Sequence, residues 1–217
     1  MIGYMQDRQQ HWDEVYSRLD DTEVSWYEAE PAESLRLLRS AGVTAADSVI
    51  DAGAGSSRLV ESLLAQGFTD LTALDVSAVA MAKTRQRMNA VAAERIRWIT
   101  ADLLTWRPRR RWAVWHDRAV FHFLTDPVDQ RRYRELLTAA LSPRAVAVIG
   151  CFAEDGPTQC SGLPTARHSQ AGLAEQFGPE FEIIEQSRSE HRTPSGGSQS
   201  FNWSVLRRRD QARSAAS

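Results

Sequence analysis

The stretch DAGAGSS, residues 51–57, contains the residue types best able to bind a charged ligand in this chain. It follows the apolar run SVI and precedes SRLVESLLAQG, whose apolar residues recur at helical spacing. Glycines in a turn between a strand and a helix let the backbone approach a ligand closely. The stretch therefore predicts a binding loop for a nucleotide-like ligand.

The loop departs from the three-glycine pattern that holds a pyrophosphate. Gly53 and Gly55 fit its first two positions, but Arg58 stands at the third, where glycine allows close helix–strand packing. Asp51 precedes the glycines, and a carboxylate beside a pyrophosphate is repulsive at close range. We expect instead a ligand that carries an ammonium and a sulfonium.

Two further acids follow apolar runs that read as strands. Asp75 ends LTALD, and Asp102 follows IRWIT within TADLL. The carboxyl ends of parallel strands share one edge of an open sheet, and ligands bind there. We expect Asp75 to accept hydrogen bonds from ribose hydroxyls and Asp102 to meet an adenine amino group.

The elements that must position these residues alternate along the chain. Strands are expected at 48–53, 71–75, 96–100, 112–117 and 144–152, and helices at 31–42, 57–67, 77–94 and 126–141. Such alternation predicts a doubly wound parallel sheet. No helix fits between two last strands, 181–190 and 198–208, so they should pair antiparallel. The expected fold class is α/β, a Rossmann-like seven-stranded sheet that ends in an antiparallel hairpin.

The motifs VIDAGAGSSRL, ALDVS and TADLL, with the terminal hairpin, resemble those of the class I S-adenosylmethionine-dependent methyltransferases, over about residues 10 to 208. More narrowly, HWDEVYSRLDDTEVSWYE, WHDRAVFHFL and FNWSVLRR resemble a bacterial subgroup labelled loosely as trans-aconitate-type. The outline is also similar to lysine methyltransferases acting on elongation factor 1A and citrate synthase. Ser57 replaces a glycine that many members carry, and a small residue there keeps the loop.

The resemblance implies S-adenosylmethionine as cofactor and three segments: a lid at 1–30, a methyltransferase domain at 31–208 and a frayed tail at 209–217. The cofactor-binding residues expected on this basis are Asp51, Ala52, Gly53, Ala54, Gly55, Asp75, Val76, Ala101, Asp102, Leu103, His116 and Trp26.

A general base is optional for methyl transfer, because a neutral amine or a thiolate needs none at the moment of attack. His122 and Asp117 are the candidates, since both follow the fourth strand, where substrates approach. The alternatives are structural: Asp117 as a helix N-cap and His122 as a satisfied buried histidine.

Four aromatic residues, Trp12, Tyr16, Trp26 and Tyr27, precede the first core helix. Trp12 and Tyr16 are four apart and so share one helical face. Their segment has little core of its own. We expect it to close over the cofactor as a lid and to form one wall of the acceptor pocket.

Composition bounds the remaining possibilities. A net charge of −2 argues against nucleic acid as a partner, and no apolar stretch is long enough for a membrane span. Cys151 and Cys160 have no metal-ligand spacing with His168, so no metal is expected. A soluble cytoplasmic protein with a small-molecule substrate is the expectation. A protein substrate, an NAD-dependent oxidoreductase and a catalytically silent cofactor-binding protein stay open as alternatives.

Overall fold

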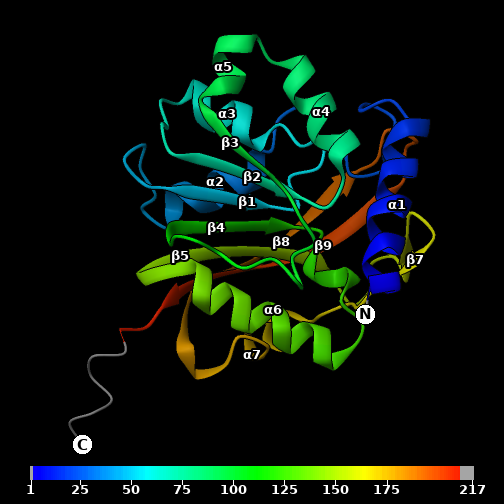
Figure 1. Ribbon diagram of the computed structural model, residues 1–217. Coiled ribbons are helices and arrows are strands. Elements are labelled where there is room, and N and C mark those ends of the chain that lie inside the picture. The colour runs from blue at the N-terminus through cyan, green and yellow to red at the C-terminus, as the bar shows by residue number, and fades with distance from the viewer. Residues whose placement is uncertain (1, 211–217) are drawn as a thin grey trace, which may run out of the picture.

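The computed structural model describes residues 2–210, with side chains from residue 8 onward. Its centre is a seven-stranded sheet in the order β3-β2-β1-β4-β5-β9-β8 (Figure 1). The strands are β1 (Val49–Ala52), β2 (Leu71–Asp75), β3 (Ile96–Thr100), β4 (Trp112–Arg118), β5 (Leu141–Phe152), β8 (Phe181–Arg192) and β9 (Ser198–Arg208).

Strands β1 to β5 run parallel, and β9 pairs antiparallel with both β5 and β8. The order reverses at β1, which lies between β2 and β4. In open α/β sheets this reversal opens a crevice at the carboxyl ends of the strands. The predicted seven-stranded sheet with a terminal antiparallel hairpin is therefore confirmed.

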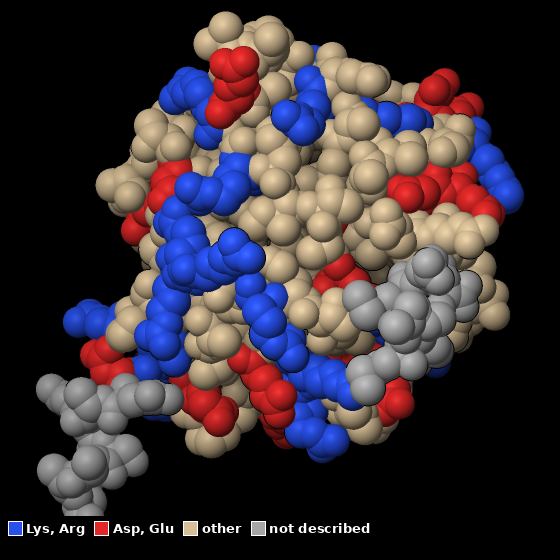
Figure 2. All heavy atoms as spheres, viewed as in Figure 1, with Lys and Arg blue, Asp and Glu red and all other residues tan. Residues whose placement is uncertain are grey.

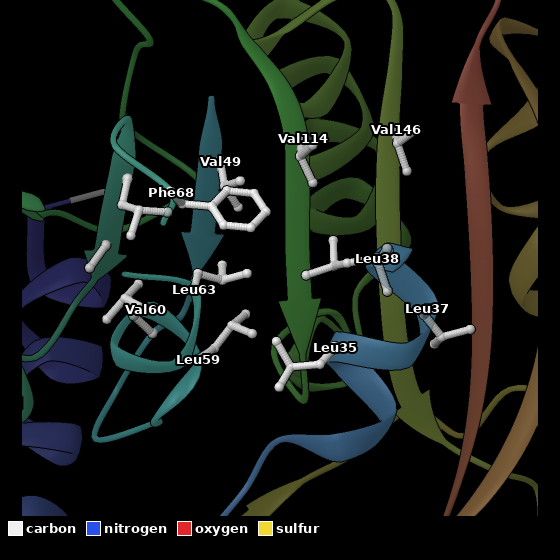
Figure 3. Packing of buried hydrophobic residues seen from close by; sticks show 14 of the residues in the cluster. Leu35, Leu37, Leu38, Val49, Leu59, Val60, Leu63, Phe68, Val114 and Val146 are labelled. Atoms are coloured by element: carbon white, nitrogen blue, oxygen red, sulfur yellow. The ribbon is translucent and has the colours of Figure 1, made fainter. Parts of the chain in front are cut away.

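Helices cover both faces of the sheet. On one face α2 (Ala32–Ser40) and α3 (Leu59–Ala65) place Leu35, Leu38, Leu59 and Leu63 against strand residues such as Val114 (Figure 3). The other face is covered by α6 (Pro127–Ala140) and α7 (Gln170–Glu175). The strands are thus buried from two sides, as parallel strands require, and their ends are held rigidly.

The helix expected at 77–94 is two helices, α4 (Ala78–Arg87) and α5 (Ala90–Glu94). Asn89 stands between them in an extended conformation, and its side chain accepts a hydrogen bond from the Ala92 amide at 2.9 Å. An asparagine that caps a new helix ends the preceding one. Ser77 and Asp126 cap α4 and α6, with their side chains accepting from the Ala80 and Val128 amides.

Helix α1 (Ile2–Arg18) stands across the carboxyl ends of the parallel strands (Figure 1). Asp13 Oδ1 ties it to the start of α4, accepting from the Ser77 hydroxyl at 2.6 Å and from the Val79 amide at 3.2 Å. After the end of α1, Asp21 accepts from Arg87 of α4 at 2.6 Å. The N-terminal segment is therefore fastened to the sheet domain at the edge where ligands bind.

Arginine and lysine side chains form a band across the face seen in Figure 2. Part of the chain's basic character comes from the run at 107–111, between β3 and β4, whose Arg107, Arg109 and Arg111 are exposed. Arg110 pairs with Asp70 through two contacts of 2.9 and 2.5 Å. The run therefore lies in a loop that exposes most of its arginines to solvent.

Candidate functional site

A cavity of about 360 Å³ opens at the carboxyl ends of the strands. That volume lies in the usual range for small-molecule sites. Its wall takes residues from the ends of β1 to β5, from β9, from α1 and the segment after it, and from a small hairpin. The hairpin consists of β6 (Gln159–Cys160) and β7 (Leu163–Pro164).

The glycine loop after β1 has the tight backbone that its sequence predicts. Gly53 and Gly55 have φ angles of 76° and 51°, which glycine alone adopts without strain. The amides of Gly53 and Ala54 both donate to the Leu74 carbonyl, at 2.7 and 3.0 Å. The loop is therefore locked onto the end of β2, beside Asp75.

Asp75 is buried and shaped by backbone donors. Its Oδ2 accepts from the Gly55 amide at 2.8 Å, and its Oδ1 accepts from the Ser77 amide at 2.7 Å. Burial raises the pKa of this carboxyl to about 6, and those amide donors pull the pKa the other way. Each carboxylate oxygen has a second lone pair, so Asp75 can still accept two hydroxyl donors from the cavity.

Asp51 is held by a buried chain of polar groups. His116 Nδ1 lies 2.7 Å from Asp51 Oδ1, and His116 Nε2 lies 2.9 Å from the Ser34 hydroxyl. The second carboxylate oxygen, Oδ2, is buried and has no hydrogen-bond partner among the described residues. A buried carboxylate oxygen without a partner is costly. Asp51 lines the cavity, where a ligand ammonium would satisfy this oxygen.

Asp102 closes the cavity beyond β3. Its Oδ1 accepts from the Leu104 amide at 2.8 Å, which fixes the turn at 101–104. Arg8 of α1 lies 3.6 Å from Asp102 Oδ2 and donates to Asp129 at 2.9 Å. Carboxylates from β1, β2 and the turn after β3 thus share one wall, as the sequence predicts.

Aromatic residues of the N-terminal segment cover this wall. Trp12, Tyr16 and Trp26 all line the cavity, with the Trp12 and Trp26 rings 5.9 Å apart. Burial and the charge of Asp75 raise the pKa of the Tyr16 phenol well above its ordinary value. Tyr27 does not line the cavity; the Arg58 guanidinium lies over its ring.

The two expected base candidates do not line the cavity. Asp117 is fully buried and accepts from the amides of Val120 and Phe121 and from the Tyr133 hydroxyl. It thus caps the short 3-10 helix η1 (Phe121–Phe123), which is the structural alternative. Its carboxyl pKa is raised by burial to about 6.

His122 belongs to η1 and is also fully buried. Its Nδ1 accepts from the Phe152 amide at 3.4 Å, and its ring packs on the Phe152 ring at 4.3 Å. Burial, together with the positive Arg118, lowers the pKa of this imidazole to about 3. A neutral, enclosed imidazole of such weak basicity does not favour a role as base, and His122 and Asp117 as bases remain predictions.

Ten of the twelve expected cofactor residues line the cavity, and Ala52 and Gly55 do not. Ala52 packs into the core on the α6 face, and Gly55 lies beneath the Tyr16 hydroxyl. The sequence missed a further set of lining residues: Arg8, His11, Ser57, Leu104, Arg118, Ala119, Val120, Phe123, Leu124, Thr125, Phe152, Cys160, Leu163, Pro164, Gln199 and Phe201. Nine of these sixteen lie inside the motifs quoted from the sequence, where the pattern does not show which side chains face the cavity; the other seven lie outside those motifs.

Two absences hold for the described part of the chain. No group of three or more His, Cys, Asp or Glu side chains there is placed to hold a metal ion. Among the helices of residues 2–210, none combines the length and the apolar character needed to cross a bilayer.

Sheet order, glycine loop and strand-end acids together define a class I methyltransferase fold. Residues 49–143 match the family model of a methyltransferase domain, a span of less than half the chain. A search among curated proteins finds no significant sequence match.

Solved structures show the same architecture. One, from a study of the conversion of a disulfide bond into a thioacetal group during echinomycin biosynthesis, has a TM-score of 0.75 at 22% identity and covers 96% of this chain and 95% of its own. A second is 1,6-didemethyltoxoflavin-N1-methyltransferase of Burkholderia thailandensis, bound to 1,6-didemethyltoxoflavin and S-adenosylhomocysteine, with a TM-score of 0.69 at 21% identity and coverage of 95% and 88%. A third is the N-methyltransferase NodS of Bradyrhizobium japonicum with S-adenosylhomocysteine, with a TM-score of 0.68 at 16% identity and coverage of 92% and 100%.

Proposed function

We propose that this protein is an S-adenosylmethionine-dependent methyltransferase that moves the methyl group by in-line displacement to a small-molecule acceptor. The observation that carries the proposal is Asp51, which lines the cavity next to a glycine loop and has one carboxylate oxygen, Oδ2, without a partner among the described residues. An ammonium group is the ligand part that satisfies it. The methyltransferase family match across 49–143 and the fold support the same conclusion.

The carboxylates divide the cofactor between them. Asp51 would accept from the ammonium, Asp75 from the two ribose hydroxyls, and Asp102 from the adenine amino group. Gly53 lets the backbone pass close to the ligand. S-adenosylmethionine, when bound, supplies a methyl group activated by a sulfonium sulfur.

The chain's own contribution is positioning and exclusion of water. Trp12, Tyr16 and Trp26 close the cavity from the solvent side. Holding two reacting groups in line can lower a barrier by about 7–11 kcal/mol at the upper end. The described imidazoles that line the cavity are those of His11 and His116, and His116 is held between Asp51 and Ser34. An acceptor that is already neutral or anionic when it attacks needs no base.

The two alternatives from other classes make different predictions. An NAD-dependent oxidoreductase would need a pyrophosphate beside Asp51, whose charge repels it. A catalytically silent protein would bind the cofactor and turn over nothing. The subgroup resemblance, the bacterial origin, the cytoplasmic location and the segment roles at 1–30 and 209–217 stay predictions; residues 211–217 lie outside the described part.

Calorimetry with S-adenosylmethionine, S-adenosylhomocysteine and NAD tests the cofactor. We expect both sulfur compounds to bind and NAD not to bind. A methyl-acceptor screen with labelled cofactor, across metabolites and a cell lysate, then tests turnover. Tight NAD binding without S-adenosylmethionine binding would overturn the proposal, and label incorporated mainly into protein would favour a protein lysine methyltransferase.

A further inference from the structure

The charges on the cavity wall are segregated by strand. The carboxylates that line the cavity, among the described residues, are Asp51, Asp75 and Asp102, all at the ends of β1, β2 and β3. The other half of the wall comes from β4, β5, β9 and the β6–β7 hairpin. Its charged lining residue is Arg118, at the end of β4; the other arginine on the wall, Arg8 of α1, lies 3.6 Å from Asp102.

Arg118 is deeply placed, with 12% of its side chain exposed. Its Nη1 donates to the Trp26 carbonyl at 2.9 Å, and its guanidinium lies over the Phe201 ring at 5.1 Å. Its Nη2 lies 3.1 Å from Glu28 Oε1, yet the approach leaves Nη2 buried without a hydrogen-bond partner. Glu28 therefore offsets the charge but does not occupy the donors.

A partly exposed guanidinium in the wall of a cavity, as at Arg118, is a site for an oxygen anion. The cofactor strengthens this preference. Its ammonium would be paired with Asp51, and its sulfonium adds positive charge beside the acceptor. A cationic acceptor would meet both Arg118 and the sulfonium with no cavity-lining carboxylate left to receive it.

The rest of this half is mostly apolar and includes the aromatic residues Phe123, Phe152 and Phe201. Phe123 lies 5.1 Å from Trp12, and Phe152 lies 5.0 Å from Phe201, measured between ring centroids. Rings arranged in this way favour a flat, apolar partner through edge and face contacts. Gln199 adds one neutral polar group to the wall.

We propose that the methyl acceptor is a planar aromatic small molecule whose carboxylate or phenolate oxygen is bound by Arg118, and that cationic amines are excluded. This inference rests on the proposed function and names the substrate class of the same site. It also argues against a lysine side chain as the acceptor, since that group carries a positive charge before it reacts.

The test is binding of matched probes to protein saturated with S-adenosylhomocysteine. The probes are 2-naphthoate, 2-naphthamide and 2-naphthylmethylammonium, which share a ring system and differ in charge. Quenching of tryptophan fluorescence, checked by calorimetry, gives each Kd. We expect the naphthoate Kd to be at least about tenfold lower than that of the ammonium probe, with the amide between them.

Variants assign the preference to Arg118. Arg118→Met should raise the naphthoate Kd by about tenfold or more and leave the amide Kd within about twofold. Arg118→Lys should recover part of the loss, because the charge returns without the planar fork. Arg36→Met is the matched control: Arg36 also pairs with carboxylates, Glu33 and Glu185, but does not line the cavity.

The outcomes are separable. Tighter or equal binding of the ammonium probe overturns the inference, as does unchanged naphthoate binding in a folded Arg118→Met protein. The same holds if none of the three probes binds up to millimolar concentration. The ranking of the three probes on the wild-type protein tests the inference even if Arg118→Met does not fold. If S-adenosylhomocysteine itself does not bind, the proposed function fails first.

Discussion

The two halves of the cavity wall are built in different ways. The half under β1, β2 and β3 uses residues adjacent in sequence to strand ends. Backbone amides hold its acids Asp75 and Asp102, and His116 holds Asp51. The other half collects Arg118, Phe152 and Phe201 with residues of a hairpin near 160. On the proposed function, the first half would hold the cofactor and the second half the acceptor.

Side chains of the first half are positioned by neighbouring backbone groups, whereas those of the second half are positioned by contacts with distant segments. A carboxylate such as Asp75 has its position set by the amides of Gly55 and Ser77. Arg118 instead depends on Trp26, Glu28 and Phe201, from segments far apart in the chain. Substitutions should therefore act locally in the first half and spread in the second.

The largest expected effect is on the first half, from Gly53→Ala. An added Cβ would collide with Val120 Cγ2, at a φ of 76° that alanine resists. The left-handed backbone costs about 1–2 kcal/mol and the overpacking about 1–3 kcal/mol. We expect S-adenosylhomocysteine binding to fall below detection by calorimetry.

Gly67→Ala is the control for Gly53→Ala. Gly67 has a φ of 91°, and a Cβ there would meet nothing within 4 Å. It should lose stability by a similar backbone penalty in chemical denaturation yet bind the cofactor product normally. Equal loss of binding in both variants would mean that strain anywhere in the domain, and not the loop, governs the site.

Much of the first half could be predicted from the sequence, because strand-end acids and glycine turns are local patterns. The same analysis expected Asp117 and His122, which also follow a strand, at the acceptor side, but neither lines the cavity. The difference is the direction in which the side chain points. The Asp117 carboxylate points to the amides of η1 and to Tyr133, and a strand pattern does not reveal this. Arg118, the very next residue, lines the cavity. Residues from the hairpin at 159–164 have no periodicity from which to place them.

The second prediction concerns Asp75→Asn. Asparagine keeps one oxygen for a backbone amide but loses the charge-assisted bonds to ribose, worth about 1.5–3 kcal/mol. We expect the Kd for S-adenosylhomocysteine to rise by about 10- to 150-fold, measured by calorimetry at pH 7.5. An unchanged Kd in a folded variant would remove Asp75 from the cofactor site.

The pH dependence of S-adenosylhomocysteine binding is a second test of Asp75. The folded pKa of Asp75 is raised to about 6 by burial, so the carboxylate becomes protonated as pH falls through 6. Wild-type affinity should decline there, and Asp75→Asn should show a flatter profile. Without ligand the sign is opposite: the folded state holds this proton above pH 3.8 while the unfolded state releases it, so stability falls as pH rises from about 4 to about 6.

The third prediction tests the joint between α1 and the first half. Asp13→Ala removes the acceptor for Ser77 and Val79. A partly exposed charge-assisted pair is worth about 1 kcal/mol here, so the product Kd should rise about fivefold. Glu14→Ala, on the exposed side of the same helix, is the control.

Hydrogen exchange of the wild-type protein tests the same contact between α1 and the first half of the cavity wall. Bound S-adenosylhomocysteine should protect residues 10–28 more than it protects the sheet core, since segments that open for ligand exchange belong to the less stable part of a fold. If exchange at 10–28 ignores the ligand, the segment only packs on the sheet edge and does not close over the cofactor.

The smallest effect on turnover should come from His122→Asn, which lies between the two halves and lines neither. Asparagine can accept from the Phe152 amide in place of Nδ1, but the contact with the Phe152 ring is lost. We expect a stability loss of about 1–3 kcal/mol at pH 7 and an unchanged pH profile of kcat.

The folded pKa of about 3 means that only the unfolded state takes up this proton below pH 6.5, so the wild-type protein loses stability from this group as pH falls from about 6.5 to about 3. His122→Asn lacks that loss, and urea denaturation should show the two proteins closer in stability at pH 4 than at pH 7. A shift in the pH profile of kcat on this substitution would instead restore His122 as a base and require the η1 turn to open toward the acceptor during turnover.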